Sequence, residues 1–150
     1  MCGRFTLTVP QKLKAMFPKY RFPGLAPRYN IAPTQRVVAL PNTGTDEAEM
    51  MVWGMSGNIN ARAETVTEKP SFKRSARERR AIVFADGYYE WKMFGDGKQP
   101  YYIRRSDGEP FTFGALWDEE LAGVAERVHA CTSSRPRPSR TSRRFTIACR

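Results

Sequence analysis

The chain has 150 residues, of which 41% are hydrophobic and 12% aromatic, enough for one globular domain with a substantial core. It contains no run of about 20 apolar residues, as a membrane-spanning helix requires, and no basic-then-apolar signal peptide at its start. The net charge of +10 favours nucleic acid as a partner, although residues 1–129 contribute only +4 of it. We therefore expect a single-domain cytoplasmic protein that is monomeric and does not bind membranes.

The three cysteines form no Cys-x-x-Cys pair, and the chain has a single histidine. These counts exclude an ordinary zinc site, so we predict neither a metal nor another cofactor. Free thiols are typical of a reducing compartment, which agrees with a cytoplasmic location.

The first half of the chain predicts short strands around one helix. Residues 2–7 alternate as a half-buried strand does, with Cys2 and Arg4 on one face and Phe5 on the other. The elements that follow are a helix over 10–17, a loop rich in Pro and Gly over 22–35, a strand over 36–40, a turn over 41–47 and a strand over 49–55.

The second half predicts further strands and one basic helix. A strand over 58–66 sets Asn60 and Arg62 on a common face, and a helix over 69–80 takes Ser71 as its N-cap. Later elements are strands over 81–85, 88–93, 101–105 and 109–117, a turn at Asp86-Gly87 and a hairpin tip over 95–99. This pattern predicts an α+β fold in one domain, built mainly on antiparallel sheet with a few short helices.

Three segments place polar groups on strands: Cys2 with Arg4, Asn60 with Arg62, and Glu90. A lone strand glutamate is most often a solvent-facing acid, and Arg62 can also form a structural ion pair with Glu64. Taken singly, these residues leave the function open.

Seven short sequence motifs, taken together and in this order, resemble those of one family. The stretches "MCGRF", "RYNIAPTQ", "INARAET", "KPSF", "FADGYYEWK", "QPYYI" and "FGALWDE" follow one another between Cys2 and about Glu120. They are similar to the SOS-response-associated peptidase (SRAP) family of abasic-site processing proteins. The resemblance implies a single SRAP domain over residues 1–129.

The resemblance also implies a chemistry. In the family, removal of the initiator methionine exposes the next cysteine, here Cys2, which links covalently to the ring-opened aldehyde of an abasic site in single-stranded DNA. An amine and a thiol on one residue suit this reaction, because the second bond closes intramolecularly to a five-membered thiazolidine. Lyase, self-reversal and autoproteolytic activities are also implied.

The family motifs assign roles to further residues. By this resemblance, Asn60 positions the reacting centre and Glu90 is the acid/base. Contacts to DNA are implied for a second set of residues: Arg4 and Arg62 on phosphates, and Trp53 and the Pro33 loop where bases stack or the strand bends.

The chain departs from the family pattern in two places. Only five residues separate Gly54 from Asn60, where many relatives carry a longer DNA-gripping loop. The family's last strand and its His-Asp-Arg-Met-Pro motif are also missing, and His129 precedes the expected position of that motif, so we assign it no role. Instead, residues 130–150 are rich in Arg, Ser and Pro, a composition that predicts a disordered tail.

The tail has a second interpretation. Codons for Cys131 to Arg150 can be chosen so that a frame shifted by two bases encodes HVITTEAKPDIAPVHDRMP, the missing ending. We therefore hypothesise a frameshift near residues 128–131, which makes the tail an out-of-frame product.

Sequencing of the coding DNA across this stretch tests the hypothesis. Because the amino acids largely determine the second codon positions, few arbitrary tails accommodate so long a motif, and we expect codons that permit the shifted peptide. An uninterrupted frame with incompatible codons would exclude the frameshift.

Two alternatives to a crosslinking enzyme remain at this stage. One is a noncatalytic single-stranded DNA-binding module, since the last strand and histidine are missing. The other is an N-terminal-cysteine peptidase, which the lack of a Cys-His arrangement disfavours.

Overall fold

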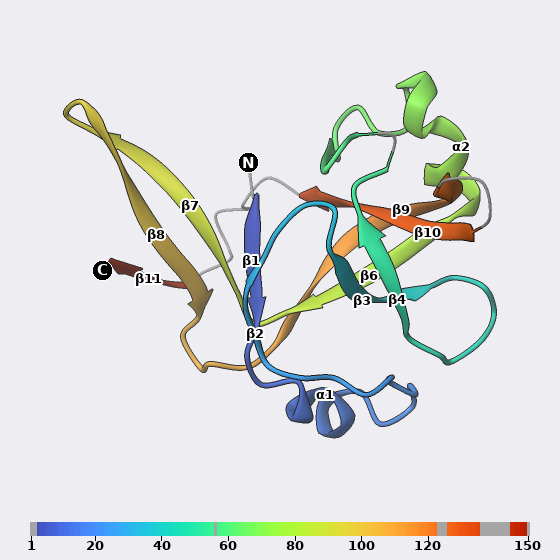
Figure 1. Ribbon diagram of the computed structural model, residues 1–150, viewed down its shortest axis with the longest axis horizontal. Coiled ribbons are helices and arrows are strands. Elements are labelled where there is room, and N and C mark those ends of the chain that lie inside the picture. Colours follow the sequence, from blue (N-terminus) through green and yellow to red (C-terminus); the bar gives the residue numbers. More distant parts are fainter. Residues whose placement is uncertain (1–2, 56, 123–125, 136–144, 150) are drawn as a thin grey trace.

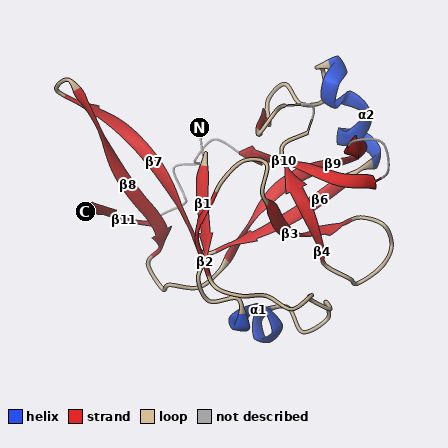
Figure 2. Ribbon diagram, viewed as in Figure 1, coloured by secondary structure: helices blue, strands red, loops and turns tan. Residues whose placement is uncertain are grey.

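The computed structural model describes residues 3–55, 57–122, 126–135 and 145–149, and strands predominate in them (Figure 2). One sheet has five strands in the order β11-β8-β7-β1-β2, and the other has six in the order β4-β3-β6-β9-β10-β5 (Figure 1). In chain order the elements are β1 (Arg4–Leu7), α1 (Gln11–Met16), β2 (Arg28–Ile31), β3 (Arg36–Pro41), β4 (Glu49–Trp53), β5 (Asn60–Arg62), α2 (Pro70–Glu78), β6 (Arg80–Ala85), β7 (Gly87–Phe94), β8 (Gly97–Arg105), β9 (Phe111–Ala122), β10 (Glu126–Arg135) and β11 (Phe145–Cys149).

This architecture confirms the predicted α+β fold. Most neighbouring strands are antiparallel, and the described parallel ladders join β10 to β4 and to β5. The strand predicted over 58–66 is shorter, because the chain leaves β10 after Arg62 and enters a turn. A strand that the sequence did not indicate, β2, forms inside the proline-rich loop because it pairs with β1.

Both predicted helices are present, with one difference at the start of α2. Its N-cap is Lys69 and Pro70 occupies the first turn, so the prediction of Ser71 as N-cap is wrong. Proline suits this position because its missing N–H has no partner there in any helix. Neither described helix is long and apolar enough to cross a membrane.

Strands extend into the segment that we expected to be disordered. Residues 130–135 belong to β10, which pairs with β9, β4 and β5, and residues 145–149 form β11 against β8. Sheet pairing supplies partners for this backbone that composition alone does not reveal.

The main hydrophobic core gathers apolar side chains from β1, β3, β4, β6 and α1. Aromatic rings meet edge to face within it, as between Phe5 and Trp53, whose centroids are 5.0 Å apart. Other members include Leu7, Leu13, Ile31, Val37, Met51 and Phe84. The core therefore fixes the position of β1, the strand that begins two residues after Cys2.

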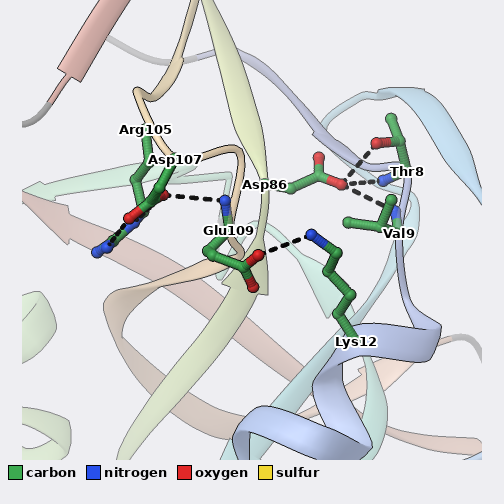
Figure 3. A network of polar contacts seen from close by, with 7 residues as sticks. All are labelled: Thr8, Val9, Lys12, Asp86, Arg105, Asp107 and Glu109. Carbon is green, nitrogen blue, oxygen red and sulfur yellow. Dashed lines mark hydrogen bonds and ion pairs between the residues drawn. The ribbon is translucent and has the colours of Figure 1, made fainter.

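Asp86 lies where the chain passes from one sheet to the other. It is the single residue between β6, in the six-stranded sheet, and β7, in the five-stranded sheet, so the predicted turn here is a crossing between sheets. Its buried carboxylate accepts hydrogen bonds from the Thr8 hydroxyl (2.7 Å) and from the backbone N–H groups of Thr8 and Val9 (Figure 3). It also accepts one from the Thr6 hydroxyl (2.5 Å). Asp86 thereby holds the end of β1 against the crossing.

A chain of hydroxyl groups continues from this carboxylate. The single proton of the Thr6 hydroxyl goes to Asp86, so the Tyr102 hydroxyl, 2.8 Å away, donates to Thr6. Burial raises the pKa of Tyr102, which keeps this donor protonated. The Tyr102 ring passes over Gly87, where an added Cβ would lie 2.2 Å from its hydroxyl oxygen, so the crossing requires glycine.

Two ion pairs lie on the surface beside this network. Lys12 of α1 contacts Glu109 at 2.7 Å, joining the helix to the segment before β9 (Figure 3). Arg105 holds the pKa of Asp107 well below its usual range through a hydrogen-bonded ion pair. Both pairs are partly exposed to solvent, where such contacts contribute little stability.

Replacing Asp86 by Asn is expected to lower the free energy of unfolding by about 2 kcal/mol or more, because an amide cannot accept this set of charge-assisted hydrogen bonds. Urea denaturation measures the change. Asp107→Asn is the matched control at an exposed carboxylate, with a much smaller expected loss because solvent screens its ion pair. Equal losses for the two variants would contradict the role of Asp86.

Candidate functional site

An open groove lies on the outer face of the five-stranded sheet, beside the start of β1. Its volume is about 560 Å³, and its lining residues are Gly3, Arg4, Asn30, Tyr89 and Trp91. Arg4 lies opposite Tyr89 in the pairing of β1 with β7, and its guanidinium donates to the Asn30 side chain at 3.2 Å. The groove thus combines a positive charge with two aromatic rings, a combination that suits an anion attached to flat groups.

Glu90 occupies the opposite face of β7 from the groove aromatics. Alternation along the strand separates Glu90 and Tyr88 from Tyr89 and Trp91, and Tyr88 packs against the core. Extending the register of β1 and β7 by one residue puts Gly3 opposite Glu90. The carboxylate predicted as acid/base is therefore one strand pair from the residue joined to Cys2.

Cys2 itself lies outside the described residues. Its described neighbour Gly3 lines the groove and has no atom within 4 Å of where a Cβ would stand.

Asn60 and Arg62 lie in the other sheet. Both belong to β5, where the backbone of Asn60 lies opposite Ser133 and that of Arg62 opposite Arg135 of β10. Asn60 is partly buried and Arg62 is exposed. The residues predicted to act together thus come from both sheets, Arg4 and Glu90 from one and Asn60 and Arg62 from the other.

Trp53 has a different position from the one predicted. Its ring is 3% exposed, packs against Phe5, and donates its Nε1–H to the Ile59 carbonyl at 2.9 Å. No face of this buried ring is open to a stacking base, because core side chains occupy that space. We therefore assign Trp53 to the hydrophobic core.

The Pro33 loop is anchored to this core residue. The N–H of Thr34 donates to the Trp53 carbonyl at 2.8 Å, and the Trp53 N–H donates to the Gln35 carbonyl at 2.9 Å. Thr34 has a φ of 70°, a conformation that is rare for a β-branched residue. Pro33 remains partly accessible on the outside of this bend.

Comparison with known proteins identifies the family. The sequence model described as SOS response associated peptidase (SRAP) matches residues 1–133. The chain belongs to the SRAP family. This match extends beyond residue 129, where we had placed the end of the domain.

Curated relatives of this SRAP chain carry names that refer to DNA damage. Abasic site processing protein YoaM of Bacillus subtilis is 34% identical over 152 residues, which cover 88% of this chain and 66% of the relative. Abasic site processing protein YedK of Escherichia coli is 39% identical over 97 residues, covering 59% and 44% of the two chains. The SRAP chain thus spans less than two thirds of the length of each.

A solved structure shares the fold. A protein from Bacteroides thetaiotaomicron superposes with a TM-score of 0.78 at 24% identity, over 89% of this SRAP chain and 67% of that protein. This likeness concerns the fold alone.

Sequence reasoning about the SRAP chain missed three groove residues, Asn30, Tyr89 and Trp91. Alternation already placed both aromatics on one face of a strand, but their proximity to Arg4 depends on pairing between segments more than eighty positions apart. Among the described residues, no group of three or more His, Cys, Asp or Glu side chains is arranged to hold a metal ion.

Two of the three tryptophans of the SRAP chain, Trp53 and Trp91, are expected to differ in their contribution to stability. Trp53→Ala should lower the free energy of unfolding by about 3–5 kcal/mol, because it empties a core site. Trp91→Ala should lower it by less than about 1 kcal/mol, because this ring is 46% exposed. Urea denaturation of both variants measures the difference, and similar losses would contradict the assignment of Trp53 to the core.

Proposed function

We propose that this chain processes abasic sites in single-stranded DNA by forming a covalent crosslink through Cys2. Membership of the SRAP family and the names of its relatives support the general role. The observation that carries the proposal is the position of Gly3, which joins Cys2 to the groove and lies in register with Glu90. A cytoplasmic location agrees with a thiol nucleophile.

The proposed reaction begins after hydrolytic removal of Met1, which frees the α-amine of Cys2. That amine attacks the aldehyde carbon of the ring-opened abasic sugar, and loss of one water molecule gives an imine. The thiol then adds to the imine carbon, forming the C–S bond while its proton passes to nitrogen, and a thiazolidine results. Reference pKa values of about 8 for the amine and about 8.5 for the thiol leave part of each group reactive near neutral pH.

Glu90 is the proposed acid/base of these steps. A carboxyl group can take the proton from the attacking amine and return it to the departing hydroxyl, provided that it lies within hydrogen-bond reach. Its register position opposite Gly3 supports this role. We propose that Asn60 orients the sugar from the second sheet, as an amide can both donate and accept hydrogen bonds.

The proposed DNA strand passes the groove beside β1. Arg4 lines this groove and Arg62 is exposed on β5, so each can neutralise a phosphate. Pro33, on the outside of its bend, is proposed to contact the strand where it turns. Lyase activity or reversal of the crosslink would proceed from the same imine.

Two other functions make different predictions. A noncatalytic single-strand binding module would bind the lesion without a covalent adduct. A peptidase acting through the N-terminal Cys2 would cleave itself or another protein independently of DNA.

Incubation of the purified protein with single-stranded DNA that carries one abasic site is expected to give a heat-stable protein–DNA adduct in a denaturing gel. Without added reductant, Cys2→Ala should form none, because it lacks the thiol that traps the imine. Cys2→Ala and Cys2→Ser both retain the α-amine, so each should give an adduct only after borohydride reduction of the imine. Binding without adduct by the wild-type protein would contradict the crosslinking function.

Glu90→Gln in the same assay separates binding from chemistry. It should slow adduct formation by about 100-fold, the lower range for losing a general acid/base, while the dissociation constant for lesion-free DNA changes little. Equal adduct rates in the two proteins would remove Glu90 from the mechanism.

A further inference from the structure

The outer half of the β7–β8 hairpin is an arm beside which the described part of the chain places no other strand. β1 pairs with β7 only at residues 87–89, and the described β11 residues pair with β8 only at 101–105. Among the described residues, 91–100 therefore pair only with one another, and Figure 1 shows the arm extending away from the rest of the molecule. An isolated two-stranded arm contributes little to a core.

This arm exposes large apolar side chains. Trp91 is 46% exposed, Met93 62% and Phe94 77%. Large apolar groups gathered on a protruding element mark an interaction surface more often than isolated ones do.

Strand geometry divides these residues between two faces. One face of β7 carries every second residue, namely Tyr89, Trp91 and Met93, and this is the face that lines the groove. Their direct partners across the hairpin, which share this face, are Tyr102, Pro100 and Lys98. Phe94 stands next to Met93 in sequence, but on the opposite face.

We propose that this face of the arm is a second contact surface for unpaired nucleotides of the strand held in the groove. The inference rests on the proposed function and extends it to nucleotides away from the lesion. Trp91 and Met93 would pack against bases, and Lys98, directly opposite Met93, would contact a phosphate.

Charge favours DNA over an apolar protein partner. Residues 91–100 carry Lys92 and Lys98 against one acid, Asp96, so the arm is net positive. A platform of flat apolar groups edged by cations is typical of single-strand binding surfaces, which tolerate any base sequence.

The length of the arm sets the expected footprint. Met93 lies four positions after Tyr89, which lines the groove, and four steps correspond to about 13 Å of strand. Stacked nucleotides advance by about 3.4 Å each, so this distance spans about four nucleotides. The arm should therefore act only on DNA that extends at least that far from the lesion on one side.

Two adjacent substitutions of equal charge test the surface. Met93→Glu and Phe94→Glu, each in the Cys2→Ala background, are compared for binding to an abasic oligonucleotide with six nucleotides on both sides. Fluorescence anisotropy gives the dissociation constants. Met93→Glu should weaken binding by at least about fivefold, the lower limit for losing one stacked base. Phe94→Glu, on the opposite face, should change binding by less than twofold.

Truncated oligonucleotides and a lysine variant complete the test. Two shortened oligonucleotides are compared, each with only two nucleotides on one side of the lesion, the 5′ side in one and the 3′ side in the other. Only one of them should abolish the effect of Met93→Glu, because the arm lies on one side of the lesion. Lys98→Ala should reduce the slope of log K against log salt by about 0.7, as expected for one phosphate contact. Circular dichroism verifies that all variants fold.

Equal weakening by Met93→Glu and Phe94→Glu would overturn the inference, because charge alone would explain it. Unchanged binding by Met93→Glu would also overturn it and leave the arm to a protein partner. Adduct formation by the protein with native Cys2 is scored separately, so failure of the crosslinking chemistry is distinguished from failure of the arm.

Discussion

The buried carboxylate of Asp86 is the constraint on which the arrangement of the site depends. One residue connects the two sheets at this point, and its side chain is saturated by donors from the end of β1. A buried carboxylate is costly unless such donors surround it, so its burial requires that Thr6 and Thr8 stay in place. The position of β1 relative to β7, and with it the register that puts Gly3 opposite Glu90, follows from this requirement.

The hydroxyl groups of Thr6 and Tyr102 extend this hydrogen-bond network from Asp86 to β8. Tyr102 reaches Thr6 only by crossing Gly87, and its ring also lies 5.0 Å from that of Tyr89, which lines the groove. One wall of the groove is therefore supported by the network that holds β1. Rigid support of this kind reduces the conformational entropy that the groove side chains would lose on binding a ligand.

Local sequence patterns predicted those elements that are determined by their own residues. The apolar spacing of α1 and the glycines at the tip of the β7–β8 hairpin are examples. Sequence patterns did not predict elements that depend on distant partners, such as β2, which forms because Ile31 pairs with Phe5. The burial of Trp53 was not predicted for the same reason. The motif gives its place in the sequence, but the packing of its ring against Phe5 determines that it is buried. Family resemblance supplied the site residues, and register shows how Arg4, Tyr89 and Glu90 are related.

The alternation of β7 explains how one strand can serve two purposes. Successive residues point to opposite faces, so Glu90 can act on one side while Tyr89 and Trp91 hold a ligand on the other. Under the proposed function, removal of Met1 leaves the reacting residue with a peptide bond on one side only, so that residue could turn toward either face. An internal cysteine would be committed to one face by its two flanking peptides. Under the proposed function, the requirement for an N-terminal aminothiol is thus geometric as well as chemical: the reacting residue would turn from the groove proposed to hold the DNA toward the carboxylate proposed to move the protons.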